Sequence, residues 1–386
     1  MKRFKVNLFS SMVAAVLIPL LLTTAVAQAQ AAPWSVVKSP NASSGNNELF
    51  GAASISATDV WAVGEFTTAS GLMQPLTLHW NGRKWSIVKS PTASSGNNIL
   101  RAVAAVSATD VWAVGSFIAA SGSGQALIEH WDGKKWSVVA SPTAGTGNVL
   151  LGVVAVSTTD VWAVGTFALT GSGIAQTLIE HWDGTSWSVV SSPNASTQTN
   201  ELAGVTAVSA SDIWAVGEFV TSGGLIQTLI EHWDGTSWSI VSSPNASTQD
   251  NLLAVAAVST TDVWAVGEFV AASGVEQALI EQWNGTRWSV VSSPSAGGSN
   301  VLSGVAIISA NDIWAVGDVV ISSLSAHTLI EQWNGTAWSV VKSPNPSSAF
   351  NVLDTAAADK SSGQAWAVGQ STAASGAAQT LTEFNP

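Results

Sequence analysis

The string Trp-Ala-Val-Gly occurs seven times in this chain of 386 residues. Its copies begin at Trp61, Trp112, Trp162, Trp214, Trp264, Trp314 and Trp366, so successive copies lie 50 to 52 residues apart. Repeats of about this length are typical of β-propeller blades. The chain is therefore expected to fold as one repeat array, although its length alone would suggest two or three domains.

Each repeat divides into four strand-like segments. In the repeat around Trp214 they are residues 202–209, 213–219, 228–233 and 238–241, which we call strands a, b, c and d. Val, Ile, Thr and Trp dominate these segments, and turn-forming residues separate them. Strand a carries Gly, Ala and Val, which suit a crowded ring axis, while the Trp residues fall on strands b, c and d.

The last repeat lacks its strand d, and the first residues of the repeat region supply a matching copy. Trp34–Pro40 has the same sequence as Trp338–Pro344, residue for residue. A closed ring uses such a split repeat as a latch, and closure removes an exposed sheet edge. We therefore predict an all-β, seven-bladed β-propeller of four-stranded blades, closed by the N-terminal strand, which completes the last blade and covers Trp366.

The N-terminal segment has the layout of a secretory signal peptide. Lys2, Arg3 and Lys5 precede an apolar run over residues 12–22, and small residues follow up to Ala31. The alternative is an uncleaved anchor, but the apolar run is short and Pro19 interrupts it. We expect residues 1–31 to be a signal peptide that is cleaved between residues 27 and 32, and residues 32–386 to be a secreted propeller.

Composition excludes several classes of function. The chain has no Cys, which excludes thiol catalysis and cysteine-ligated metals, and no Tyr. Its net charge of −12 argues against nucleic acid as a partner, because such partners require clustered Lys and Arg. No segment after the signal is expected to insert into a membrane.

The run Leu-x-x-Val-x-x-Val-Ser-x-x-Asp-Val-Trp-Ala-Val-Gly, followed by Trp-Asp-Gly-x-x-Trp, resembles the BNR/Asp-box propellers. It is most similar to the photosystem II assembly-factor-like propellers of bacteria and plastids. The resemblance implies the fold, and it departs at the box itself, which reads His-Trp-Asp-Gly-Thr-Ser-Trp over residues 181–187. The family also includes sialidases, which use a Tyr nucleophile and three arginines. That chemistry is excluded here because Tyr is absent and Arg83, Arg101 and Arg287 stand at unrelated repeat positions.

Three columns of polar residues recur along the repeats. The Asp column, which we interpret as turn caps, is Asp59, Asp110, Asp160, Asp212, Asp262 and Asp312, with Gln364 in the last repeat. The Glu column, interpreted as a solvated or internally paired strand position, is Glu129, Glu180, Glu231, Glu281, Glu331 and Glu383. The His column, interpreted as structural hydrogen bonding because Gln282 and Gln332 continue it, is His79, His130, His181 and His232.

None of these columns predicts a single site, because each recurs in nearly every blade. We therefore expect no catalytic residue, no cofactor and no metal. His327 stands alone in a b–c loop. The sequence looks bacterial, so we expect no glycan on the Asn-x-Ser/Thr sequons, which begin at Asn41, Asn194, Asn245, Asn284 and Asn334.

The variable loops indicate which face would bind a ligand. The a–b and c–d turns are short and nearly invariant, whereas the b–c and d–a loops vary, and function on repeat scaffolds lies in variable loops. We expect a monomeric, non-enzymatic binding or scaffold propeller that recognises an extracellular protein or glycan through the b–c and d–a loops. The alternative is a glycan-active propeller enzyme. Unrepeated polar residues gathered at the axis would favour the enzyme, and repeat-equivalent packing throughout would favour the binding protein.

Overall fold

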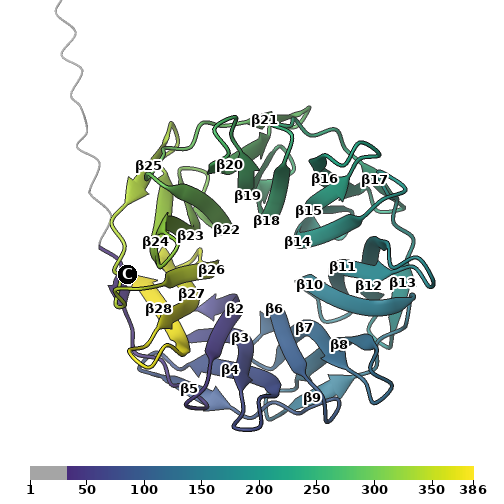
Figure 1. Ribbon diagram of the computed structural model, residues 1–386. Coiled ribbons are helices and arrows are strands. Elements are labelled where there is room, and N and C mark those ends of the chain that lie inside the picture. Colours follow the sequence, from purple (N-terminus) through teal and green to yellow (C-terminus); the bar gives the residue numbers. More distant parts are fainter. Residues whose placement is uncertain (1–32) are drawn as a thin grey trace, which may run out of the picture. The chain divides into compact units, whose positions relative to one another are not determined.

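The computed structural model describes residues 33–386, which form seven four-stranded antiparallel sheets around a central axis (Figure 1). The predicted seven-bladed propeller is confirmed. The predicted signal peptide, residues 1–31, lies outside the described residues. Over residues 33–386, no helix has the length and apolar character needed to cross a membrane.

Strands a lie nearest the axis, where Figure 1 labels them around the centre of the ring. They are β2 (Asn47–Ser56), β6 (Asn98–Ser107), β10 (Thr146–Ser157), β14 (Asn200–Ser209), β18 (Asp250–Ser259), β22 (Ser299–Ser309) and β26 (Asn351–Asp359). Strands b, which carry the Trp-Ala-Val-Gly motif, are β3 (Asp59–Thr67), β7 (Asp110–Ile118), β11 (Asp160–Ala168), β15 (Asp212–Val220), β19 (Asp262–Val270), β23 (Asp312–Ser322) and β27 (Gln364–Thr372). We number the blades 1 to 7 in this order.

The two outer strands complete each blade. Strands c are β4 (Met73–Trp80), β8 (Gly124–Trp131), β12 (Ala175–Trp182), β16 (Ile226–Trp233), β20 (Glu276–Trp283), β24 (Ser325–Trp333) and β28 (Ala378–Asn385). Strands d are β5 (Trp85–Val88), β9 (Trp136–Val139), β13 (Trp187–Val190), β17 (Trp238–Ile240), β21 (Trp288–Val290), β25 (Trp338–Val341) and, for blade 7, β1 (Ser35–Val36). The strands predicted around Trp214 are therefore correct to within two residues at each end.

The latch strand β1 pairs with β28, as the split repeat predicts. Ser35 lies opposite Phe384, and the Val37 amide donates a hydrogen bond to the carbonyl oxygen of Thr382 at 2.9 Å. The order of strands in blade 7 is β1-β28-β27-β26, so chain segments from the two ends of the propeller share one sheet.

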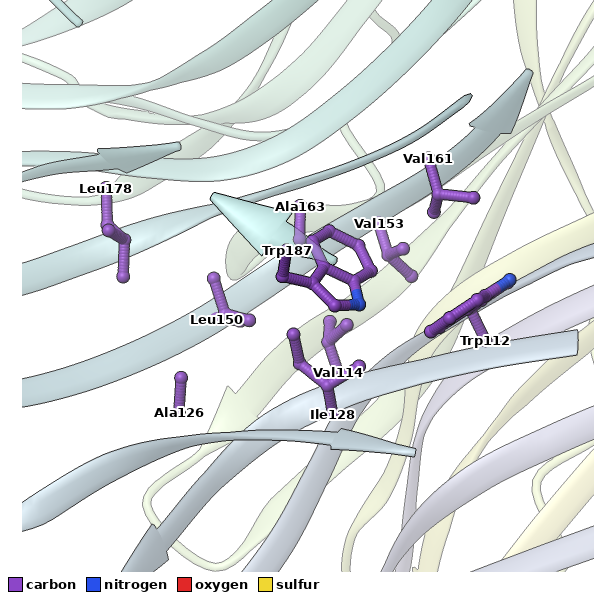
Figure 2. Packing of buried hydrophobic residues seen from close by; sticks show 10 residues of the cluster. All are labelled: Trp112, Val114, Ala126, Ile128, Leu150, Val153, Val161, Ala163, Leu178 and Trp187. Atoms are coloured by element: carbon purple, nitrogen blue, oxygen red, sulfur yellow. The ribbon is translucent and has the colours of Figure 1, made fainter. Parts of the chain in front are cut away.

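Apolar side chains fill the seams between blades. In the seam between blades 2 and 3, Figure 2 shows the Trp187 indole among aliphatic side chains of both blades, including Leu150 and Val114. The Trp112 ring of blade 2 meets the edge of Trp187 at a centroid distance of 5.5 Å. Each strand-b Trp is covered in this way by outer-strand rings of the next blade, which is how the tryptophan repeat stabilises the ring without disulfides.

Trp34 of the latch also covers the strand-b Trp of the preceding blade, and this differs from the expectation that the latch covers Trp366. Trp34 packs edge-on against Trp314 of blade 6 at 5.3 Å and is 5% exposed. Trp366 is covered by Trp80 and Trp85 of blade 1, at 4.9 and 5.1 Å. The tryptophan of the latch therefore covers the preceding blade, as in every other blade, and of the latch it is Val37 that packs against the cluster containing Trp366.

The propeller has two different faces. On one, which we call the loop face, the d–a loops contact the ends of strands b: Ser196 Oγ donates to the Val220 carbonyl oxygen at 2.6 Å. On the other, the turn face, Trp233 Nε1 donates to the carbonyl oxygen of Ala210 in the a–b turn at 3.2 Å. The strand-a residues nearest the loop face are thus the first ones of each strand.

Candidate functional site

The Asp and His columns pair with each other inside blades 1 to 4. Asp160 Oδ1 lies 2.8 Å from His181 Nε2, and the same pair joins Asp59–His79, Asp110–His130 and Asp212–His232. In the next two blades Gln replaces His and donates from Nε2 to Asp262 or Asp312 at 2.9 Å. The structural reading of the His column is confirmed. The turn-cap reading of the Asp column is wrong, because these carboxylates accept from strand c.

The Glu column lies in the seams. Each of its six carboxylates is fully buried and accepts a hydrogen bond from a Ser hydroxyl of the preceding blade; Ser192 Oγ donates to Glu231 Oε2 at 2.8 Å. Burial raises the pKa of Glu231 to about 8, and the Ser192 hydrogen bond opposes the rise. The column is thus internally paired and never converges on one place. Blade 1 has Leu78 at this position.

The remaining candidates also have structural surroundings. His327 lies in strand β24 and is exposed, so its assignment to a loop is corrected. The sequon residues Asn41, Asn194 and Asn245 accept hydrogen bonds from strand-c amides, whereas Asn284 and Asn334 cap c–d turns. Within residues 33–386, no group of three His, Asp or Glu side chains is placed to hold a metal ion.

A feature of strand a that the sequence reading missed defines the candidate site. In blade 1, Leu49 pairs with Gly64 and Gly51 pairs with Val63, so Phe50 is an extra residue with no partner across the sheet. The same β-bulge recurs in all seven blades. Bulges re-aim a side chain and are frequent beside functional sites.

The glycine of the Trp-Ala-Val-Gly motif makes the bulge possible. A Cβ atom at Gly64 would lie far inside van der Waals contact of the Glu48 carbonyl oxygen, and the equivalent glycines are equally crowded. Only glycine lets strand a approach strand b this closely. The most recognisable motif of the sequence therefore shapes the axis.

The seven bulged residues all line one cavity on the axis, which we call the axial mouth. They are Phe50, Arg101, Leu151, Ala203, Leu253, Ser303 and Asp354. The cavity has a volume of about 190 Å³. This is one of the few strand positions at which the repeats differ in charge, polarity and size. Alignment of the seven strands a by their buried Leu would have revealed the variation; the sequence reading treated strand a as uniformly small and apolar.

Arg101 and Phe50 interact within this ring. The guanidinium carbon of Arg101 lies 4.4 Å from the centroid of the Phe50 ring, a cation–π contact between blades 2 and 1. The other arginines within residues 33–386, Arg83 and Arg287, lie in c–d turns on the turn face.

Carboxylates form an arc around the axial mouth on its loop-face side. Glu48 and Glu65 face each other across β2 and β3, and Glu201 and Glu218 do so across β14 and β15. Glu268 of blade 5, Asp318 of blade 6 and Asp354 of blade 7 continue the series. Blade 3 has Val149 and Thr166 at the paired positions and therefore contributes no charge to the arc.

The pKa values of the arc are raised. Burial raises the pKa of Glu268 to about 7, and the carboxylates of Glu276, Asp318 and Glu218 add to the effect. Burial, with a smaller contribution from Glu276, raises the pKa of Asp318 to about 6. For Asp354 burial again dominates and raises the pKa to about 7; Glu48 and Asp318 raise it further and Arg101 opposes them.

Comparisons with known proteins support the fold. No family model matches the chain, and no curated protein matches it. The solved structure of YCF48 bound to D1 peptide is 15% identical, with a TM-score of 0.56 over 92% of this chain and 96% of that one. YCF48 from Cyanidioschyzon merolae is 16% identical, with a TM-score of 0.56 over 92% and 99%.

Two polysaccharide-acting propellers are similar to the same degree. An ulvan lyase bound to a sulfated disaccharide repeat of glucuronic acid and rhamnose is 10% identical, with a TM-score of 0.57 over 88% of this chain and 93% of that one. A GH74 xyloglucanase from Xanthomonas campestris is 14% identical over 90% of this chain, with a TM-score of 0.56, and the match spans 55% of that enzyme. At these identities the likeness is one of fold: the chain is a seven-bladed β-propeller similar in architecture to the photosystem II assembly factor YCF48.

Proposed function

We propose that this chain is an exported, non-enzymatic binding propeller that recognises a polypeptide segment of a protein partner at the axial mouth, from the loop face. The observation that carries the proposal is the ring of seven bulged residues. In chains whose blades are near copies, the positions free of fold constraints are those available for recognition. The bulge releases these side chains from pairing and directs them to one cavity.

The dimensions of the site favour a chain segment over an enclosed small molecule. Pockets that enclose small ligands have volumes of about 300–1,000 Å³, and the axial mouth has about 190 Å³. It therefore suits one or two inserted side chains, with the rest of the ligand lying on the loop face. Exposed aliphatic side chains are available there in five b–c connections: Leu72, Leu169, Leu225, Val275 and Leu324. The binding of a peptide by YCF48, a propeller of the same fold, is consistent with this mode.

A steric plug in the ring tests the proposal. We expect a displayed library of random peptides to yield sequences that bind the chain, and Ala203→Trp to abolish their binding by filling the axial mouth. Ser237→Trp places the same bulk in a c–d turn on the turn face and should leave binding intact. Peptides that bind both variants equally, or a library that yields none, would overturn the proposal.

A glycan-active enzyme is the second candidate, and Asp354 is the observation that favours it. Asp354 is an unrepeated carboxyl at the axis whose raised pKa of about 7 suits proton transfer near neutral pH. Turnover of xyloglucan or ulvan that is lost in Asp354→Asn would establish this function instead. The non-enzymatic proposal expects no turnover of either polysaccharide.

Export and monomeric state belong to the same proposal. Lys2, Arg3 and Lys5 before an apolar run support export through a cleaved signal peptide. N-terminal sequencing of the exported protein should give a start between residues 28 and 32, and a protein retaining Met1 in membranes would contradict cleavage. Sedimentation should give the mass of one chain.

A further inference from the structure

We propose that the axial mouth selects a polypeptide segment that carries lysine or arginine side chains, and that these side chains lie against the carboxylate arc of blades 4 to 7 and 1. This inference rests on the proposed function and names the chemistry of the partner. Its evidence is the arrangement of charge around the mouth and two enclosed carboxylate oxygens of the arc that accept no hydrogen bond.

The arc is continuous across neighbouring blades. The pKa of Glu268 in blade 5 is raised by the charges of Glu218 in blade 4 and Asp318 in blade 6, in addition to the larger effect of burial. Asp354 of blade 7 feels Asp318 on one side and Glu48 of blade 1 on the other. Arg101 of blade 2 is the only cationic side chain among the residues lining the mouth.

Two of these carboxylates each have one oxygen that is enclosed without a hydrogen-bond partner. Asp354 Oδ2 has almost no solvent-accessible surface and accepts no hydrogen bond. Glu65 is 8% exposed, and its Oε2 is likewise enclosed and unpaired. A buried carboxylate without a donor costs free energy when it is charged, so a cation held close to it stabilises it more than it would stabilise an already paired group.

Arg101, the single nearby cation, opposes the rise in the pKa of Glu48, Glu65 and Asp354, but it forms a salt bridge with none of them. Arg101 lies over the Phe50 ring, and the salt bridges found among residues 33–386 are four His–Asp pairs inside the blades. Burial is the main cause of the raised pKa values of Glu268 and Asp354, and repulsion from neighbouring carboxylates adds to it. An ammonium or guanidinium group placed among them would remove that repulsion.

The spread of the charges indicates an extended ligand. They follow the ring from blade to blade, and in the described part of the chain no three of them converge to coordinate a metal ion. A polypeptide with several positive side chains can meet successive carboxylates, while its apolar residues contact Phe50 or Leu151 in the same ring. A single metal ion would satisfy only one part of the arc.

Three labelled probes test the inference. They are fluorescein-labelled twelve-residue peptides with one Gly/Ser backbone, carrying four Lys, four Glu or no charged residue. In fluorescence anisotropy we expect only the lysine peptide to bind, with affinity falling as salt rises. Asp354→Asn and Glu65→Gln should each weaken binding about tenfold, the factor expected for one lost charge-assisted contact.

The matched controls are Asp183→Asn and Asp234→Asn. Each removes one negative charge on the turn face, where Asn284 and Asn334 already make the same turn-capping hydrogen bonds. We expect both to bind the lysine peptide as the unmodified chain does. Thermal melts of all four variants would confirm that they are folded.

Several outcomes would overturn the inference. Equal binding of the three probes, or a lysine peptide insensitive to both Asp354→Asn and Glu65→Gln, would exclude cationic recognition at this arc. If spermine or calcium chloride displaces the lysine peptide when present at the same concentration as the peptide, the site binds cations in general and does not select a polypeptide. If library peptides without positive charge still lose binding in Ala203→Trp, the proposed function stands and only the charge selectivity fails.

Discussion

At the scale of the residue, the glycine of Trp-Ala-Val-Gly has two roles that the motif alone does not reveal. It permits the close approach of strand a, and it thereby produces the bulge that turns one side chain per blade toward the axis. We expect Gly217→Ala to lower the free energy of unfolding by about 1–3 kcal/mol, the usual cost of forcing an extra carbon into a packed site. The new Cβ would meet the carbonyl oxygen of Glu201.

Gly223→Ala is the matched control for this substitution. Gly223 lies in the b–c connection of the same blade, where an added Cβ has only the Thr221 hydroxyl at 3.8 Å nearby. Denaturant unfolding should show a marked fall in the free energy of unfolding for Gly217→Ala and little change for Gly223→Ala. Equal stabilities would show that the bulge does not depend on glycine.

The buried glutamates of the seams predict how stability depends on pH. Burial raises the pKa of Glu129, Glu231, Glu281 and Glu383 to about 8 and that of Glu180 and Glu331 to about 7. A carboxyl with a raised pKa in the folded state stabilises the fold at low pH, and that stability is lost as pH rises from the unfolded value toward 8. The melting temperature should therefore fall between pH 5 and pH 8.

Glu231→Gln isolates one of these groups. The amide oxygen can still accept the hydrogen bond of Ser192, but no charge forms in the seam. Each unit of pKa shift corresponds to about 1.4 kcal/mol. The free energy of unfolding of the variant, relative to that of the unmodified chain, should therefore rise steadily from pH 5 to pH 8. A stability difference that is constant across this range would contradict the assignment.

At the scale of the element, the latch strand holds blade 6 and blade 1 as well as blade 7. Trp34 packs on Trp314 of blade 6, whereas Val37 packs against the seam cluster that contains Trp85 of blade 1. Ser39 Oγ lies 2.8 Å from Thr380 Oγ1, and Asn41 Oδ1 accepts the Thr380 amide at 2.9 Å. A strand of two paired residues is thus fixed by side chains on both sides of it.

Trp34→Ala should destabilise the propeller by about 3–5 kcal/mol, as expected for removing a packed Trp. Val36→Ala on the same strand is the control, because Val36 is 44% exposed. Removing residues 33–40 should go further and expose the edge of β28, with aggregation or a large fall in melting temperature. A truncated chain that melts like the full one would show that the latch does not close the ring.

Strand positions followed from sequence far better than strand irregularities did. Turn residues and β-branched runs located all four strands of the Trp214 repeat because their spacing is local. The bulge depends on a contact between Gly217 and the backbone of Glu201, which are sixteen positions apart, and no local pattern reports it. The Asp column was misread for the same reason: its His or Gln partner lies some twenty residues later.

At the scale of the whole molecule, the number of blades and their closure could be predicted because the motif copies and the strands of each repeat can be counted in the sequence. Seven motifs and a split strand leave few alternatives to a closed ring. The candidate site could not be predicted in this way, because it exists only where seven non-equivalent side chains from distant repeats meet at the axis. Residues such as Arg101 and Asp354 are 253 positions apart and line the same cavity.

The absence of cysteine from the chain allows the site to be located with a single label. Ser303→Cys places a thiol at the axial mouth, and Ser237→Cys places one in a c–d turn on the turn face. Each would carry an environment-sensitive fluorophore while the tightest-binding peptide from the displayed library is added. We predict a spectral change, or blocked binding, for the label at Ser303 and none at Ser237. The axial site would be contradicted if the label at Ser237 responds to the peptide while the label at Ser303 neither responds nor weakens binding.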